Sequence, residues 1–98
     1  MRIVSGKYKG RLIRPGKKIS ARPTTDFAKE NLFNILETRI DFDDKDVLDL
    51  FAGTGAMGIE ALSRGARHAV FVDSAPAAIA AIRQNLTALD LMTAATVI

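Results

Sequence analysis

The sequence predicts an α/β domain built on a parallel sheet, because strand-like and helix-like segments alternate along most of its length. A short apolar segment, 47–51, runs into a glycine-rich turn and then into a helix-forming segment. Gly53, Gly55 and Gly58 have the G-x-G-x-x-G spacing of a nucleotide-binding turn. Asp73 follows Gly53 by 20 residues, where such a unit places an acid that binds ribose. Together these observations indicate a nucleotide-binding βαβ unit.

The N-terminal part of the chain predicts a hairpin followed by a helix. Two short extended segments within residues 1–13 flank a glycine-bounded loop, which is the pattern of a β-hairpin. A helix is expected over 26–39, with Thr24 or Thr25 as its N-cap. An apolar stripe at helical spacing is expected to pack in the core, and its members are Ala28, Leu32, Ile35, Leu36 and Ile40.

The remaining residues alternate as a βαβαβ series should. Gly65 is expected to end the first helix of the series, and Ser74 to cap the second, with Pro76 in its first turn. Short crossovers of this kind build a parallel sheet. The expected elements are strands at 46–51, at 68–73 and from 96 onward, and helices at 56–64 and from 76 onward, with Ile79, Ile82, Leu86 and Leu89 facing the sheet.

Basic side chains gather at the N-terminus. Residues 1–25, here called the basic arm, hold eight of the 14 basic residues and none of the 11 acidic ones, which leaves residues 26–98 with a net charge of −5. A segregated basic segment is typical of an element that binds a polyanion, although a solvated tail is the alternative. Tyr8, between Lys7 and Lys9, can stack on a base or serve as a half-buried strand aromatic.

Composition excludes several classes of site. The chain has no cysteine and one histidine, which argues against disulfides, thiolate chemistry and a histidine-based metal site, so no metal ligand is predicted. It contains neither a signal-peptide pattern nor the run of about 20 apolar residues that a membrane-spanning helix needs. We therefore expect a cytoplasmic protein without membrane contact.

Two classes of cofactor, dinucleotides and S-adenosylmethionine, bind to this architecture, and Asp49 distinguishes them. It lies inside the first strand, four residues before Gly53, where a dinucleotide-binding fingerprint usually has an apolar residue. A carboxylate at the carboxyl end of this strand faces the crevice and can accept a hydrogen bond from the ammonium of S-adenosylmethionine. The alternative is a carboxylate that caps the N–H groups of the turn itself. Gly53 and Gly55 allow close approach of the ligand, whereas Gly58 is expected to permit close helix–strand packing.

These residues bring out a resemblance to a known family. Residues 49–66 (DLFAGTGAMGIEALSRGA) resemble motif I of the RsmD-type ribosomal RNA methyltransferases. Residues 3–11 resemble that family's N-terminal basic hairpin, and residues 22–26 together with 31–36 resemble its next signature. The resemblance covers essentially all 98 residues, in the order of the family.

The resemblance implies a Rossmann-like S-adenosylmethionine-dependent methyltransferase fold and an enzyme that methylates the exocyclic N2 of a guanine in small-subunit ribosomal RNA. It implies that residues 1–25 contact the ribosomal RNA or small ribosomal subunit, and that residues 26–98 form the N-terminal half of the methyltransferase domain. The expected cofactor-binding residues are Asp49, Phe51, Ala52, Gly53, Thr54, Gly55 and Asp73. The expected RNA-binding residues are Lys7, Tyr8, Lys9, Arg11 and Arg22.

The family also carries an Asp/Asn-Pro-Pro-Tyr/Phe motif after its fourth strand, and these 98 residues contain no such tetrapeptide. We therefore assign no catalytic residue, and we expect the 98-residue chain alone to be inactive. The first strand of an incomplete sheet presents an open edge, so we expect the isolated chain to self-associate through it. Two alternatives stay open: a non-catalytic module that binds nucleic acid or cofactor, and a fragment of an NAD-dependent oxidoreductase, which Asp49 and the basic arm disfavour.

Overall fold

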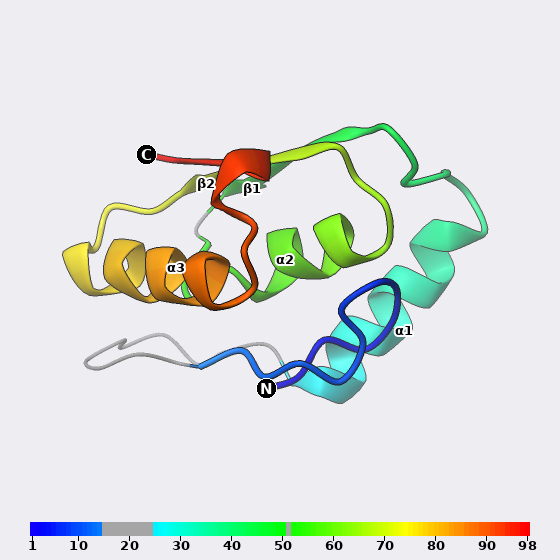
Figure 1. Cartoon of the computed structure of the whole chain (residues 1–98). Helices are drawn as coiled ribbons and strands as arrows, with labels where there is room; N and C mark the ends of the chain where they lie inside the picture. The colour runs from blue at the N-terminus through cyan, green and yellow to red at the C-terminus, as the bar shows by residue number, and fades with distance from the viewer. Residues whose placement is uncertain (15–24, 51) are drawn as a thin grey trace.

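The computed structural model describes residues 1–14, 25–50 and 52–98. Within them the chain forms a parallel sheet and three α-helices, which confirms the predicted α/β class (Figure 1). None of the helices in this part of the chain is both long and apolar enough to span a bilayer. The elements are, in chain order, α1 (Asp26–Glu37), β1 (Asp46–Leu50), α2 (Ala56–Ser63), β2 (His68–Val72), α3 (Pro76–Ala88), the 3₁₀ turn η1 (Met92–Ala94) and β3 (Ala95–Val97).

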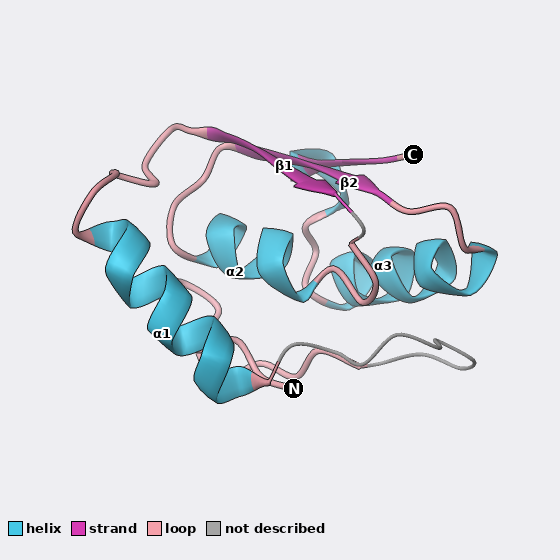
Figure 2. Ribbon diagram, turned by 180° about the vertical axis from the view of Figure 1, so that it is seen from behind, coloured by secondary structure: helices cyan, strands magenta, loops and turns pink. Residues whose placement is uncertain are grey.

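The sheet has the order β1-β2-β3, and both pairs of neighbouring strands are parallel, with Leu48 opposite Val70. Helices α2 and α3 lie together on one side of the sheet (Figure 2). Ala69 and Phe71 of β2 are completely buried, whereas Leu48 and Leu50 of β1 expose 62% and 58% of their surface. Because successive strand side chains point to opposite faces, the core lies on the helix-covered face, and the other face of β1 is open to solvent.

Helix α2 comes close to β2 because Gly58 has no side chain. A Cβ atom at Gly58 would lie 2.3 Å from Cε1 of Phe71, a distance that no packed side chain tolerates. The expectation that Gly58 permits close helix–strand packing is confirmed. The third glycine of the turn therefore fixes the distance between α2 and the sheet.

Helix α1 begins as predicted but buries a different face. The Thr25 side chain is its N-cap and accepts a hydrogen bond from the Ala28 N–H at 3.1 Å. The residues that α1 buries fully are Lys29 and Phe33, at 0% and 4% exposed. The predicted core stripe was wrong for most of its members, since Leu36 is half-buried but the others are exposed: Ala28, Leu32, Ile35 and Ile40.

The helix ends follow the sequence signals with one exception. Gly65, at φ +120°, follows the end of α2 as predicted. The N-cap of α3 is Ala75 rather than the predicted Ser74, and its side chain makes no capping bond. Instead a carboxylate oxygen of Asp73 accepts the Ala75 N–H at 2.9 Å. The prediction failed because Asp73 already satisfies the backbone N–H that precedes the helix, and Pro76 at the start of the helix has no N–H to be capped.

Residues 1–14 of the basic arm form a tight hairpin-like loop that is packed against the rest of the protein. Arg2 and Leu12 form a single antiparallel bridge, so the predicted hairpin is present as a bridge rather than as two full strands. Ile3 and Ile13 are each 1% exposed and belong to the main hydrophobic core. In Figures 1 and 2 this segment lies beyond α2 and the end of α3 as seen from the sheet, and every residue of α2 except Met57 is buried.

Candidate functional site

The glycine-rich turn links the carboxyl end of β1 to the start of α2. Gly53 and Gly55 have φ angles of +58° and +84°, a left-handed conformation that glycine adopts without strain. Gly55 is the N-cap of α2, and its N–H donates to the carbonyl of Ala52 at 2.8 Å. A Cβ at Gly53 would meet nothing within 4 Å, so this position has open space beside it. The turn therefore has open space beside Gly53 at the partially positive end of a helix, as a site for a nucleotide cofactor requires.

The Asp49 carboxylate lies beneath this turn. Its Oδ2 accepts the N–H of Gly58, in the first turn of α2, at 3.0 Å. The carboxylate therefore binds the start of the helix that follows the glycine turn, which is close to the alternative of a carboxylate that caps the N–H groups of the turn itself. Burial raises the pKa of Asp49 to about 6, the nearby Asp73 charge adds to the rise, and the bond from Gly58 opposes it. A carboxylate has about four acceptor positions, so Asp49 retains capacity to accept from a ligand ammonium.

The Asp73 carboxylate follows β2 and joins it to the turn. Its Oδ2 accepts the Gly53 N–H at 2.9 Å, and its Oδ1 accepts the Ala75 N–H at 2.9 Å. These backbone hydrogen bonds, the one from Ala75 first, lower the pKa of Asp73. The structure therefore brings the predicted ribose-binding acid into direct contact with the first glycine of the turn. It holds the acid as a carboxylate, the form that accepts from hydroxyl groups.

The other predicted cofactor residues are partly placed. Ala52 and Thr54 are buried, at 9% and 7% exposed, and the Ala52 N–H donates to the Val72 carbonyl at 3.0 Å. Both therefore shape the turn through their backbone. Phe51 lies outside the described residues.

The predicted RNA-contacting side chains that are described lie on the hairpin-like loop. Lys7, Lys9 and Arg11 are exposed, and Tyr8 is half-buried with the Lys7 ammonium 5.6 Å from its ring centre. The Arg11 guanidinium donates to the carbonyl of Ala88, at the end of α3, at 3.1 Å. Arg22 lies outside the described residues. The structure thus leaves a cationic, partly aromatic surface on a segment that is anchored to the core.

Sequence reasoning missed the polar residues that anchor this loop. The Glu60 carboxylate is 0% exposed and accepts the N–H groups of Val4 and Ser5 at 2.9 and 3.0 Å. The Ser63 hydroxyl donates to the Ser5 carbonyl at 2.6 Å and accepts the Tyr8 N–H at 3.0 Å. Both anchors lie among the apolar residues of α2. A polar residue on a buried helix face is the signal that could have identified them.

A third anchor, Asn85, holds the other end of the loop. It lies on α3 and is 3% exposed. Its side-chain amide exchanges two hydrogen bonds with the backbone of Arg14 and donates a third to the Thr54 carbonyl of the glycine turn. Asn85 lies on the same face of α3 as the apolar residues Ile82 and Leu89, three residues after the first and four before the second. A polar residue on an apolar helix face is again the signal that could have identified it.

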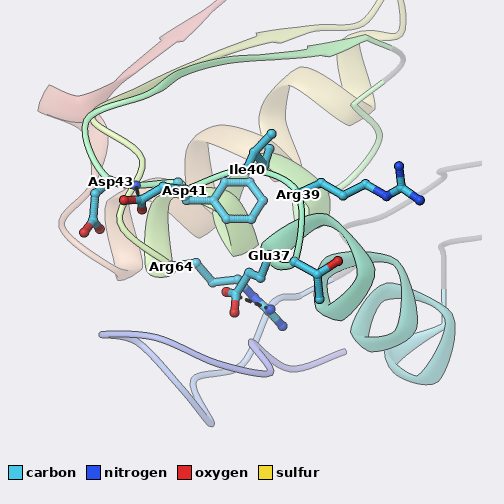
Figure 3. Close-up of a pocket in the computed structure, with 8 residues that line it drawn as sticks. Glu37, Arg39, Ile40, Asp41, Asp43 and Arg64 are labelled. Atoms are coloured by element: carbon cyan, nitrogen blue, oxygen red, sulfur yellow. Dashed lines mark hydrogen bonds and ion pairs between the residues drawn. The ribbon is translucent and has the colours of Figure 1, made fainter.

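Two cavities in the described part of the chain lie next to helix α2. One, of about 290 Å³, lies between α1, β1 and α2 and has Asp49 in its otherwise mostly apolar wall. The other, of about 510 Å³, lies at the opposite end of α2 from the glycine turn (Figure 3). Arg64 in that cavity already pairs with Glu37 at 3.0 Å and Glu60 at 2.8 Å, so its charge is neutralised. The residues that line the second cavity are Glu37, Thr38, Arg39, Ile40, Asp41, Phe42, Asp43 and Arg64.

The fold and the site define a class of protein. A parallel sheet with a glycine turn after its first strand, and acids at the carboxyl ends of two neighbouring strands, is the Rossmann-like architecture of the S-adenosylmethionine-dependent methyltransferases. The chain belongs to the family described as "Conserved hypothetical protein 95", which matches residues 1–98 and corresponds to the predicted RsmD-type family.

Named relatives agree with this assignment. The chain is 48% identical over 91 residues to "Putative rRNA methyltransferase YlbH" of Bacillus subtilis, covering 93% of this chain and 48% of that protein. It is 40% identical over 89 residues to "Ribosomal RNA small subunit methyltransferase D" of Escherichia coli, covering 91% and 44%. The solved structure "Putative methyltransferase yhhF" from Escherichia coli superposes with a TM-score of 0.83 at 36% identity, covering 100% and 51%. The chain therefore spans about half the length of the curated relatives it matches.

Proposed function

We propose that this chain is the cofactor-binding part of an enzyme that transfers a methyl group from S-adenosylmethionine to the exocyclic N2 of a guanine in small-subunit ribosomal RNA. The observation that carries the proposal is the pair of carboxylates, Asp49 and Asp73, that both hold backbone N–H groups of the turn region. Relatives named as ribosomal RNA methyltransferases support the substrate class. The resemblance in motif I and in the basic hairpin supports the choice of guanine N2. We place the reaction in the cytoplasm, where ribosomal RNA is processed.

The cofactor supplies an electrophilic methyl group bonded to sulfur. In the proposed site Asp73 accepts from the ribose hydroxyls, because it is an ionised carboxylate with acceptor capacity beyond its two backbone bonds. Asp49 accepts from the ammonium of the methionine part. Gly53, Thr54 and Gly55, with the neighbouring Phe51 and Ala52, hold the remainder through their backbone. None of these residues is assigned to proton transfer at the guanine amine.

The basic arm, residues 1–25, has the second role in this proposal. Lys7, Lys9, Arg11 and Arg22 meet RNA phosphates, and Tyr8 contributes a ring face for a base. The anchoring of residues 1–14 to α2 and α3 supports this division, because it gives the cationic surface a fixed position relative to the turn. Residues 26–98 then hold the methyl donor.

Titration calorimetry with S-adenosylhomocysteine and with NAD tests the class of cofactor. We expect S-adenosylhomocysteine to bind and NAD not to bind. Preference for NAD would favour the oxidoreductase alternative and overturn the proposal. A second experiment tests the position that is methylated. The native protein is incubated with labelled S-adenosylmethionine and small-subunit ribosomal RNA, and the modified nucleoside is identified. Methylation at any position other than guanine N2 contradicts the proposal. If the native protein binds S-adenosylhomocysteine and RNA but transfers no methyl group, the non-catalytic module is favoured.

A further inference from the structure

The side chain of Asn85 connects the basic arm to the glycine turn. Its Nδ2 donates to the Arg14 carbonyl at 2.9 Å and to the Thr54 carbonyl at 3.0 Å, and its Oδ1 accepts the Arg14 N–H at 2.9 Å. Both amide hydrogens are used, and the three partners fix which end of the amide is oxygen. A single buried side chain thus bonds to two segments separated by about 40 residues of sequence.

The bond to Thr54 holds the central peptide of the turn. The carbonyl of this peptide belongs to Thr54 and accepts from Asn85, whereas its N–H belongs to Gly55 and donates to Ala52 at 2.8 Å. Gly53 and Gly55 flank Thr54 with positive φ angles, and glycine permits other backbone angles at little energetic cost. Asn85 on the carbonyl and Ala52 on the N–H therefore hold this peptide in one orientation, and the bond from Asn85 is the one that links it to the basic arm.

The bonds to Arg14 hold the returning side of the hairpin-like loop. Ile13, next to Arg14, is buried in the core and donates its N–H to the Met1 carbonyl at 2.8 Å. Three residues before Arg14 is Arg11, one of the proposed RNA-binding cations. The position of this cationic surface and the orientation of the turn peptide consequently depend on the same amide group.

We propose that Asn85 is a positioning residue that couples cofactor binding at the turn to the placement of the basic arm. This inference rests on the proposed function, because it takes the turn as the cofactor site and the arm as the RNA contact. A cofactor that binds the turn restricts the Thr54–Gly55 peptide to one orientation. The Asn85 amide then stays bonded to the Thr54 carbonyl and keeps its remaining groups on Arg14. By linkage, an arm fixed by RNA favours the turn conformation that binds cofactor to the same degree.

Amide hydrogen exchange at Ile13 and Arg14 tests the coupling without requiring RNA. In the wild-type chain, saturating S-adenosylhomocysteine should slow exchange at these two amides by about fivefold or more, the lower end of ordinary coupling between sites. In Asn85→Ala the ligand should no longer slow it. A residue that merely satisfies buried polar groups would change stability but would not make exchange at the arm depend on the ligand.

Two further variants keep the test decisive. Asn85→Asp retains an oxygen that accepts the Arg14 N–H but loses both donors, so it should also abolish the ligand effect if the bond to Thr54 carries the coupling. Ser63→Ala is the matched control, because Ser63 anchors the same loop at Tyr8 and Ser5 and makes no bond to the turn in the part of the chain that is described. It should raise exchange with and without ligand and leave the ratio unchanged.

The outcomes separate the two proposals. If S-adenosylhomocysteine binds the wild-type chain but leaves exchange at Ile13 and Arg14 unchanged, the coupling is wrong and the proposed function stands. If the ligand does not bind, both are wrong. Because the wild-type measurement decides first, a variant that fails to fold does not remove the test. An effect that persists in both Asn85 variants would assign the coupling to other residues and overturn the role of Asn85.

Discussion

The ammonium of Lys29 lies 3.2 Å from a carboxylate oxygen of Glu60, and neither side chain exposes any surface. Lys29 also donates to the Arg2 carbonyl at 2.6 Å, while Glu60 receives the N–H groups of Val4 and Ser5. This ion pair therefore joins α1, α2 and the N-terminal loop at one point. Burying charge is favourable only where partners of this kind satisfy it, so the loop is part of the fold rather than an appendage.

Removing the ammonium should destabilise the whole chain. We expect Lys29→Met to lower the free energy of unfolding by about 3 kcal/mol, because Glu60 would remain buried with one fewer cation. Urea denaturation measures this change. Asp46→Asn is the matched control: the Arg67–Asp46 pair is 2.7 Å apart but 63% exposed on each side, and its loss should change stability far less than Lys29→Met does. Equal effects of the two substitutions would contradict a structural role for the buried pair.

Asp49 should destabilise the ligand-free protein at neutral pH. Its pKa is about 6 in the folded protein, above the ordinary value of 3.8, so the folded state binds a proton that the unfolded state has released between these values. The free energy of unfolding therefore falls as pH rises through this window and stays lower above it. Asp49→Asn keeps an oxygen that accepts the Gly58 N–H and removes the charge. We expect it to be more stable than wild type by about 1–2 kcal/mol above pH 6, after allowance for partial exposure, and equal to it near pH 4.

Parallel urea titrations from pH 4 to pH 7 measure this difference. Other carboxylates titrate in both proteins, so only the difference between variant and wild type reports Asp49. A variant that is less stable than wild type at pH 7 would show that the ionised carboxylate contributes to folding and contradict the prediction.

The affinity for the cofactor should rise with pH over the range in which the free energy of unfolding falls. Only the ionised form of Asp49 accepts from the ligand ammonium, so the affinity for S-adenosylhomocysteine should rise with pH up to about 6, by as much as tenfold per unit, and then level off. Asp49→Asn should bind weakly at every pH in this range. Asp73 provides the control, since its lowered pKa keeps it ionised throughout. Asp73→Asn should weaken binding and keep the rise with pH, displaced to lower pH because the Asp73 charge no longer raises the pKa of Asp49. If the affinity of the wild type does not change with pH, Asp49 does not bind the ammonium of the ligand.

The sequence predicted this site better than it predicted the packing around it. Glycine spacing and the acid 20 residues later are local signals, and the structure brings Gly53 and Asp73 together. The burial of Lys29 was not predictable from periodicity, because periodicity counts apolar residues and this lysine is buried by a partner far along the chain. For the same reason the apolar residues of α1, such as Ile35, were assigned to the core and are 58% exposed.

The basic arm should contribute a salt-dependent part of RNA affinity. Replacing Lys7, Lys9 and Arg11 together with alanine should lower affinity for small-subunit ribosomal RNA, and should reduce the slope of log affinity against log salt by about 2–3. Filter binding over a range of salt concentrations measures both quantities. The triple alanine variant of Arg39, Lys45 and Arg83 removes the same charge from exposed positions outside the arm and should leave the slope nearly unchanged. If the two variants behave alike, net charge and not the arm governs binding.

The isolated 98-residue chain should self-associate through β1. Among the described strands β1 pairs only with β2, so its other edge presents unpaired backbone N–H and C=O groups. Leu48 and Leu50, at 62% and 58% exposed, place apolar surface beside that edge. An open apolar edge is a template for pairing with another chain. Size-exclusion chromatography with light scattering should therefore show dimers or larger species.

Charge at this edge should oppose the association. We expect Leu48→Lys to shift the population toward monomer, because a lysine on an edge strand must be desolvated when a second strand pairs there. Leu12→Lys is the matched control: Leu12 is 42% exposed on the N-terminal loop, away from β1, and this substitution adds the same charge without reaching the edge. A wild-type chain that runs as a stable monomer contradicts self-association altogether. A wild-type oligomer that Leu48→Lys leaves intact, or that Leu12→Lys disrupts equally, would place the interface away from β1.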